Sequence, residues 1–244
     1  RYAFISSLIL ATSFFIVFSG RNGQWDIFTH GFMMAAIYQF YLFFSTPEKK
    51  YQRMLLAALF FGCSFMSKGP VSFYALLLPF LIAYGFVFKF KRGTKSVLPL
   101  LLFLVVSLLL SGWWHIYTYL LDPQQVIATT TKETTNWTSY NVRPFYYYWS
   151  FFIQSGIWCI PAFISLLYPY LKNKVFFKKG YQFTLLWTLC SVFLLSIIPE
   201  KKSRYLLPVL IPLALNTGFY IEYLFRKFKD LKDKRETIPV YFNF

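Results

Sequence analysis

Charged residues gather near the C-terminal end of the sequence, within five consecutive positions: Glu200, Lys201, Lys202 and Arg204. The group separates two apolar runs, residues 184–198 and 205–225, and it is too short to form a domain and too polar to lie in hydrocarbon. The sequence therefore predicts a tight turn at a membrane surface, with a membrane span on each side. Clustered lysine and arginine side chains bind anions, and the anion that a protein meets at such a surface is typically a lipid phosphate.

Further ionisable residues fall at or near the ends of apolar runs: Asp26, His30, Lys68, His115, Asp122, Glu133 and Arg143. Asp26 and His30 are four positions apart at the start of one run, so they share a helical face. Any one of these residues could simply mark the end of a helix. The whole set favours a functional site, because ionisable groups at membrane depth are costly and helix termination does not require an excess of positive charge.

The composition indicates a membrane protein with several spans. The chain has 244 residues, of which 57% are hydrophobic, and it contains 31 phenylalanines and several long apolar runs. The formal net charge of +16 lies in short segments between these runs, which is the pattern of topology-determining charge and argues against a nucleic-acid groove. The three cysteines lie inside apolar runs and form no CxxC pair, so they predict no disulfide framework.

We expect an all-α integral membrane domain that comprises residues 1–225 and has about eight transmembrane helices. The spans are expected at residues 3–19, 27–45, 47–66, 71–88, 97–121, 144–171, 184–198 and 205–225. Thr46, Pro47 and Glu48 suit the N-cap, the first position and the first turn of the third span. Residues 122–143 are expected to form a polar, threonine-rich loop, and residues 226–244 a basic cytoplasmic tail. Because the sequence opens at Arg1 directly in an apolar run, we interpret it as a fragment.

The distribution of lysine and arginine predicts the orientation. Eighteen of these residues fall on the side that holds both ends of the chain, and seven fall on the other side. The positive-inside rule therefore places both ends in the cytoplasm of a multi-pass protein, which we expect in the inner (plasma) membrane. Asp26, Lys68 and the turn at 200–204 then lie on the extracytoplasmic face. Cations are normally scarce there, so their presence in this turn strengthens the prediction of an anion site.

Four segments carry a resemblance to a known family. Residues 65–70, Phe-Met-Ser-Lys-Gly-Pro, resemble a TKGP-type motif with serine in place of threonine, and residues 143–148 resemble a basic-Pro-Phe-aromatic motif. Residues 202–208 resemble a K-x-x-Y-x-L-P turn, and residues 20–26 resemble a short external loop that ends in an acidic position. In this order and spacing they are similar to the lipid-linked sugar transferases related to aminoarabinose transferase and protein O-mannosyltransferase.

The resemblance implies a fragment of a GT-C type glycosyltransferase. Such an enzyme would transfer a sugar, with inversion, from a polyprenyl-phosphate donor to a lipid, glycan or protein acceptor on the extracytoplasmic side. The principal catalytic carboxylate of the family would lie upstream of Arg1. Glu133 and Thr134 stand where the family has an acid-histidine pair that binds metal in some members. We therefore assign no metal ligand and no certain cofactor, and a divalent metal stays an open alternative.

The residue types suit this chemistry on their own account. A phosphate leaving group develops negative charge as the glycosidic bond breaks, and fixed cations stabilise that charge best where water is scarce. The expected substrate-binding residues are Lys68, Arg143, Lys201, Lys202, Arg204 and Tyr205. Asp26 is the first candidate for the catalytic carboxylate that holds or deprotonates the acceptor, and Glu133 is the second. The expected partners are the donor, the acceptor and membrane lipids, with no nucleic acid.

Other classes of membrane protein remain alternatives at this stage. A lipid-linked glycan polymerase or ligase would need the same phosphate site. A transporter or flippase would also have many spans, but the sequence shows no matched pair of Gly/Pro-broken spans and no acidic residue at mid-membrane depth. A structural subunit would have no reason to carry cations on its external face.

Overall fold

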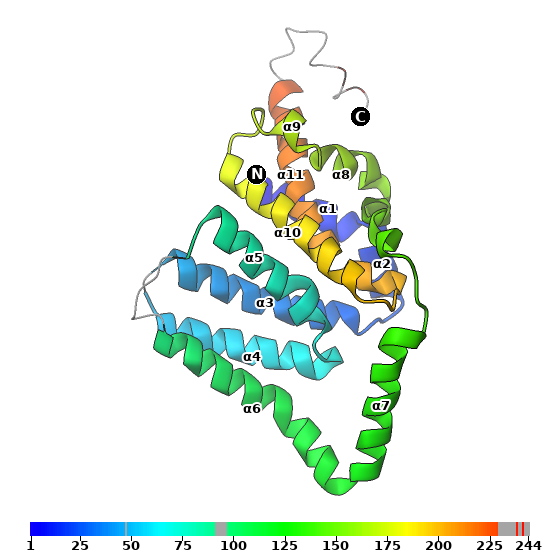
Figure 1. Ribbon diagram of the computed structural model, residues 1–244. Coiled ribbons are helices and arrows are strands. Elements are labelled where there is room, and N and C mark those ends of the chain that lie inside the picture. The colour runs from blue at the N-terminus through cyan, green and yellow to red at the C-terminus, as the bar shows by residue number, and fades with distance from the viewer. Residues whose placement is uncertain (47, 91–96, 229–237, 239–240, 242–244) are drawn as a thin grey trace.

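The computed structural model describes residues 1–46, 48–90, 97–228, 238 and 241, and these residues form a bundle of helices (Figure 1). The α-helices are α1 (Tyr2–Thr12), α2 (Phe14–Arg21), α3 (Asp26–Ser45), α4 (Lys50–Lys68), α5 (Leu78–Val87), α6 (Val97–Leu121), α7 (Pro123–Ser139), α8 (Cys159–Ser165), α9 (Tyr168–Leu171), α10 (Lys178–Ile197) and α11 (Leu210–Phe228). A π-helical turn, η1 (Phe73–Leu77), precedes α5. Three 3-10 segments are η3 (Phe145–Tyr148), η4 (Phe151–Trp158) and η5 (Ser203–Leu206). The predicted all-α class is confirmed.

Several helices have the length and composition of membrane spans. Within the described ranges, α3, α6 and α10 each meet both criteria, and α1 with α2 meets them as a pair bent by 56°. The surface of α6 is mostly exposed leucine, valine and aromatic side chains, as expected for a face in contact with lipid. The chain is therefore an integral membrane protein.

The helices pack in two groups that share one core. α4 lies between α3 and α6, while α11 packs against α1 and α10 (Figure 1). α5 joins the groups because it packs against α10 and its core side chains also meet those of α3. Phe40, Phe80 and Trp187 belong to this shared core, and the Trp187 indole donates a hydrogen bond to the carbonyl of Leu76 at 3.1 Å. Arg226, in the last turn of α11, donates a hydrogen bond to the carbonyl of Lys174 at 2.9 Å. This bond links the end of α11 to the segment that follows α9.

The predicted sixth span, residues 144–171, is not one helix. The chain there forms η3, η4, α8 and α9 in succession, with a kink at Gly156, whose φ is +66°. A Cβ at Gly156 would lie 2.6 Å from the Cβ of Phe14, so α2 packs closely against the kink. Glycine is required here for the positive φ and for this close approach. Periodic hydrophobicity could not reveal the break, because the side chains remain apolar throughout it.

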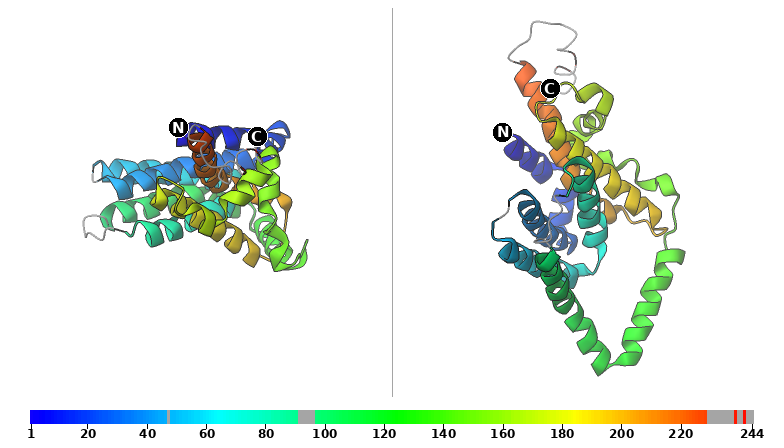
Figure 2. Two further views of the ribbon diagram at one scale, coloured as in Figure 1. Left: turned by 90° about the horizontal axis from the view of Figure 1, so that it is seen from above. Right: turned by 60° about the vertical axis from the view of Figure 1, so that its left-hand side comes forward.

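The predicted polar loop at 122–143 is largely helical. α7 begins after Asp122, whose carboxylate accepts a hydrogen bond from the Gln125 backbone N–H at 3.0 Å, and Pro123 occupies its first turn. Threonine hydroxyls along α7 donate to the carbonyls one turn earlier, for example Thr134 to Thr130 at 2.9 Å. This satisfies the polar side chains without a partner helix. Figure 2 shows α6, which packs against α4, and α7 as the two arms of a V whose tip points away from the rest of the bundle.

The predicted start of the third span was also wrong. α4 begins at Lys50, after Lys49 at φ 52°, whereas Thr46 follows the end of α3 and donates to the carbonyl of Leu42 at 2.8 Å. Pro47 lies outside the described residues, as do residues 91–96 of the predicted basic loop. Of the predicted tail from 226, residues 226–228 are the last turn of α11, and most of the remainder also lies outside the described residues.

Candidate functional site

Two segments far apart in the chain pair at the end of α10. Val142 and Glu200 form an isolated antiparallel bridge. The backbone N–H of Arg143 donates to the carbonyl of Pro199 at 3.3 Å, and that of Lys201 donates to the carbonyl of Asn141 at 3.1 Å. This pairing places Arg143 beside the charged turn.

The two lysines of the turn have different surroundings. Lys201 is 3% exposed, and its ammonium donates to the carbonyls of Leu195, Ser196 and Ile198, which are unpaired acceptors at the C-terminus of α10. Burial lowers the pKa of Lys201. Lys202 instead pairs with Glu200, with 2.5 Å between Nζ and Oε1.

The electrostatic balance at Lys202 favours its charged form. Burial lowers the pKa of Lys202, but the hydrogen bond that its ammonium donates to Glu200 and the negative charge of that carboxylate outweigh this effect, so the pKa is raised overall. Lys202 therefore stays protonated at neutral pH. Its ammonium therefore carries the positive charge that an anion would bind.

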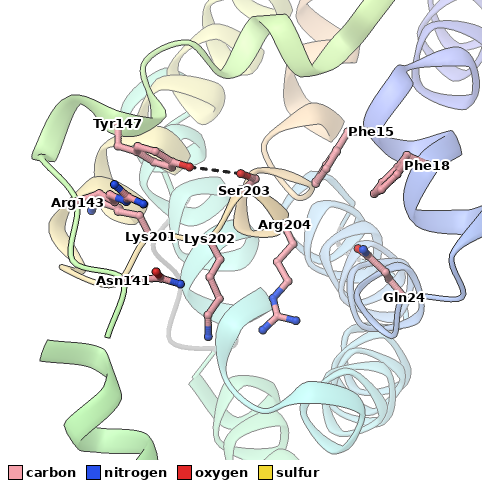
Figure 3. Close-up of a pocket in the computed structure, with 10 residues that line it drawn as sticks. All are labelled: Phe15, Phe18, Gln24, Asn141, Arg143, Tyr147, Lys201, Lys202, Ser203 and Arg204. Carbon is pink, nitrogen blue, oxygen red and sulfur yellow. Dashed lines mark hydrogen bonds between the residues drawn. The ribbon is translucent and has the colours of Figure 1, made fainter. Parts of the chain in front are cut away.

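A pocket of about 490 Å³ opens at this turn, and we call it the cation pocket. It is lined by Phe15, Phe18, Gln24, Asn141, Arg143, Tyr147, Lys201, Lys202, Ser203 and Arg204. Figure 3 shows Lys202 and Arg204 side by side in the space between Asn141 and Gln24, with the two phenylalanines of the bent α1–α2 pair beyond Arg204. Among the described residues, neither Arg143 nor Arg204 forms a salt bridge with a carboxylate. The pocket thus combines free positive charge with an apolar wall.

A buried polar cluster lies next to the cation pocket. Asp26 is 3% exposed and forms an ion pair with Lys68, the last residue of α4. Nε2 of His30 is 4.0 Å from the same carboxylate, and Nδ1 of His30 is 2.6 Å from the hydroxyl oxygen of Ser72. Gly69, at φ 76°, turns the chain sharply after Lys68, which explains the glycine of the Ser-Lys-Gly-Pro motif.

The polar cluster and the cation pocket are electrostatically coupled. Burial lowers the pKa of Lys68, the contact with Asp26 opposes this effect, and the nearby charges of Arg204 and Lys202 lower the pKa further. The structure therefore brings together five of the predicted residues from four separate segments of the chain. Asp26 with Lys68 forms one group, and Arg143, Lys202 and Arg204 form the other.

The remaining predicted residues lie at the margin of this arrangement. Lys201 lines the cation pocket, although its ammonium is held by carbonyls. Tyr205 donates its hydroxyl to Glu200 at 3.3 Å, so it contacts the carboxylate of the turn. Glu133 is exposed on α7 and does not line the cation pocket.

Sequence reasoning missed Phe15, Phe18, Gln24, Ser72 and Asn141, and it included Tyr147 and Tyr148 only as part of the aromatic motif at 143–148. Tyr148 is 1% exposed, and its hydroxyl hydrogen bonds to the backbone of Lys202. Periodicity gives no signal for such residues, since their contacts depend on helices that are distant in sequence. Among the described residues, no group of three or more His, Cys, Asp or Glu side chains is placed to hold a metal ion.

Fold and site together define a class, a multi-span α-helical membrane protein with a cationic pocket at one end of its bundle. Residues 1–115 match the family described as dolichyl-phosphate-mannose-protein mannosyltransferase. The chain is also similar to the undecaprenyl phosphate-alpha-4-amino-4-deoxy-L-arabinose arabinosyl transferase 1 of Proteus mirabilis, with 25% identity over 96% of the chain and 42% of that protein. An uncharacterized protein of Aquifex aeolicus is 26% identical over 90% of the chain and 42% of its own length.

A solved structure shares the fold. The crystal structure of ArnT from Cupriavidus metallidurans bound to undecaprenyl phosphate superposes with a TM-score of 0.66 at 16% identity, over 93% of this chain and 43% of ArnT. The chain thus spans a little over two fifths of the length of these relatives. These similarities in sequence and fold support the resemblance to GT-C type glycosyltransferases that the sequence motifs carry.

Proposed function

We propose that this chain is part of a glycosyltransferase that moves a sugar from a polyprenyl-phosphate donor to a lipid, glycan or protein acceptor. The observation that carries the proposal is the cation pocket, which Arg143, Lys202 and Arg204 line together with Phe15 and Phe18. A polyprenyl phosphate has a compact anionic head and an apolar tail, so it matches both walls. The names of the similar proteins support the same donor class.

The cations of the pocket suit a phosphate that gains charge during the reaction. As the bond between the sugar and the phosphate breaks, the phosphate oxygen takes the bonding electrons and leaves as polyprenyl phosphate. Arg143 and Arg204, which have no carboxylate partner among the described residues, can each give a bidentate contact to that oxyanion. Lys202 and Lys68 add point charges in positions already fixed by Glu200 and Asp26.

Asp26 is our first candidate for the carboxylate that acts on the acceptor. The acceptor oxygen or nitrogen forms the new bond to the anomeric carbon and gives up a proton, which a positioned carboxylate can receive. Asp26 lies beside Lys68 and His30, and these contacts hold its carboxylate in place. Glu133 is the alternative, and its exposed position on α7 would require the acceptor to approach that helix.

We further propose that the cation pocket faces the extracytoplasmic side of the inner (plasma) membrane. The structure supports a common side for Asp26, Lys68, Arg143 and Lys202, since all lie around one end of the bundle. The basic segment that contains Lys174 lies elsewhere in the bundle, where it contacts the end of α11. The positive-inside rule then assigns the basic end to the cytoplasm.

Cysteine labelling tests this orientation. We expect a cysteine at Thr130 on α7 to react with a membrane-impermeant maleimide in intact cells, and a cysteine at Asn173 to react only after permeabilisation. Both side chains are exposed in the structure, so a difference in labelling would report the side of the membrane on which each one lies. Labelling at Asn173 and protection at Thr130 in intact cells would move the cation pocket to the cytoplasmic face and contradict the proposal.

A transfer assay tests the reaction itself. Membranes that contain the complete gene product should transfer label from a polyprenyl-phosphate sugar to an endogenous acceptor and release polyprenyl phosphate in equal amount. Membranes without the gene are the control. Release of a polyprenyl diphosphate together with a lengthened glycan would indicate a polymerase or ligase, and movement of donor across the membrane without release would indicate a flippase. Either outcome would overturn the proposed transfer.

A further inference from the structure

One buried tyrosine contacts the charged turn through its backbone. The hydroxyl of Tyr148 accepts a hydrogen bond from the backbone N–H of Lys202 at 2.9 Å and donates one to the carbonyl of the same residue at 3.1 Å. Tyr148 is 1% exposed and belongs to a core cluster with Leu206 and Leu207, which follow the turn. A rigid, fully packed ring therefore holds both polar backbone groups of Lys202.

The turn has a second attachment on its other side. The ammonium of Lys201 is fixed to the carbonyls at the end of α10, and it lies 5.3 Å from the centre of the Tyr148 ring. Two backbone hydrogen bonds join the turn to residues 141–143. The ammonium of Lys201 thus lies against the protein interior, although Lys201 also lines the pocket, whereas the charged ends of Lys202 and Arg204 extend into it (Figure 3).

We infer that Tyr148, together with Lys201, is a positioning residue that directs Lys202 and Arg204 toward the donor phosphate. The inference rests on the proposed function, since it concerns the same phosphate. Its physical basis is preorganisation: long cationic side chains on a mobile turn would lose conformational entropy on each binding event, whereas a clamped backbone has already lost it. Neither Tyr148 nor Lys201 needs to touch the donor for this effect.

The substitution Tyr148→Phe tests the inference, because phenylalanine keeps the ring and removes both hydrogen bonds. In the complete gene product, we expect the Kd for a short-chain polyprenyl phosphate and the donor KM to rise about tenfold. The acceptor KM and the thermal midpoint should change little. Tyr146→Phe is the matched control, because it removes the hydroxyl of an exposed neighbour and should leave every value unchanged.

A combination of substitutions distinguishes a positioning role of Tyr148 from a purely structural one. When Lys202 and Arg204 are both replaced with alanine, Tyr148→Phe should weaken donor binding by only about twofold or less, because neither of these cations is left to position. Lys201→Met should reproduce the donor-specific loss and the same coupling, and it serves as the second variant if Tyr148→Phe does not accumulate.

The outcomes discriminate between the two claims. No binding of polyprenyl phosphate by the wild type would overturn the proposed function and this inference together. Binding by the wild type, with unchanged Kd in both Tyr148→Phe and Lys201→Met, would overturn the inference alone. An equal loss with and without Lys202 and Arg204 would also overturn it, because the tyrosine would then act independently of the cations.

Discussion

Replacing Asp26 with asparagine is expected to lower sugar transfer by about 10²-fold or more, the scale typical of a positioned acid-base group. Asparagine keeps the shape of the side chain and removes its charge. In the structure Asp26 is buried, ion-paired with Lys68 and adjacent to His30, so its charge is the property on which the local arrangement depends. The measurement is transfer of labelled sugar from a polyprenyl-phosphate donor by the complete gene product at matched membrane abundance.

A structural role for Asp26 predicts a different result. Asp26 is the first residue of α3, and its carboxylate contacts Lys68 and His30. If it serves only to neutralise Lys68, then Asp26→Asn should reduce abundance or thermal stability, and the molecules that remain folded should transfer normally. Asp122→Asn is the control, because Asp122 does cap a helix, α7, and asparagine caps nearly as well. Unchanged turnover per folded molecule in Asp26→Asn would remove Asp26 from the catalytic residues.

Removal of the cations is expected to have the other large effect. Lys68→Ala, Lys202→Ala and Arg204→Ala should each lower transfer by about 10²-fold to 10³-fold, as the loss of one preorganised donor to a developing oxyanion does in other enzymes. Insertion into the membrane should be unaffected by Arg204→Ala in particular, because Arg204 is exposed and forms no salt bridge among the described residues. The experiment measures kcat and donor KM for each variant.

The chemistry of each cation refines this expectation. Arg204→Lys keeps the charge and loses the bidentate geometry, so it should recover part of the activity that Arg204→Ala loses. Lys132→Ala is a matched control, because Lys132 is an exposed cation on α7 that does not line the cation pocket. Wild-type turnover in Lys68→Ala, Lys202→Ala and Arg204→Ala would contradict a phosphate site at this turn. A similar loss in Lys132→Ala would point to general surface charge instead.

The sequence was sufficient to predict the elements that depend on local composition. The apolar run at 97–121 was predicted with the bounds that α6 has in the structure, since hydropathy and length define a span without reference to its neighbours. The charged turn at 200–204 was predicted for the same reason, because a short polar interruption between two apolar runs must be a turn. The helix at 123–139 was missed, although the Asp122-Pro123 pair is a typical helix start.

The candidate site depends on contacts that the sequence does not encode locally. Charge sorting placed Asp26, Lys68, Arg143 and the turn on one face of the membrane, but it could not say which cation pairs with which carboxylate. Those pairs, Lys68 with Asp26 and Lys202 with Glu200, were shown by the structure.

By itself, therefore, the sequence predicted the all-α membrane class, the positions of several helices and the family resemblance. Hydrophobic periodicity, loop charge and short motifs are properties of consecutive residues, so they can be recognised without knowledge of how the helices pack. The tertiary structure decided which of two adjacent lysines presents its ammonium to the cation pocket. That choice depends on the unpaired carbonyls at the end of α10 and on the hydroxyl of Tyr148, both of which meet the turn only after the helices have packed.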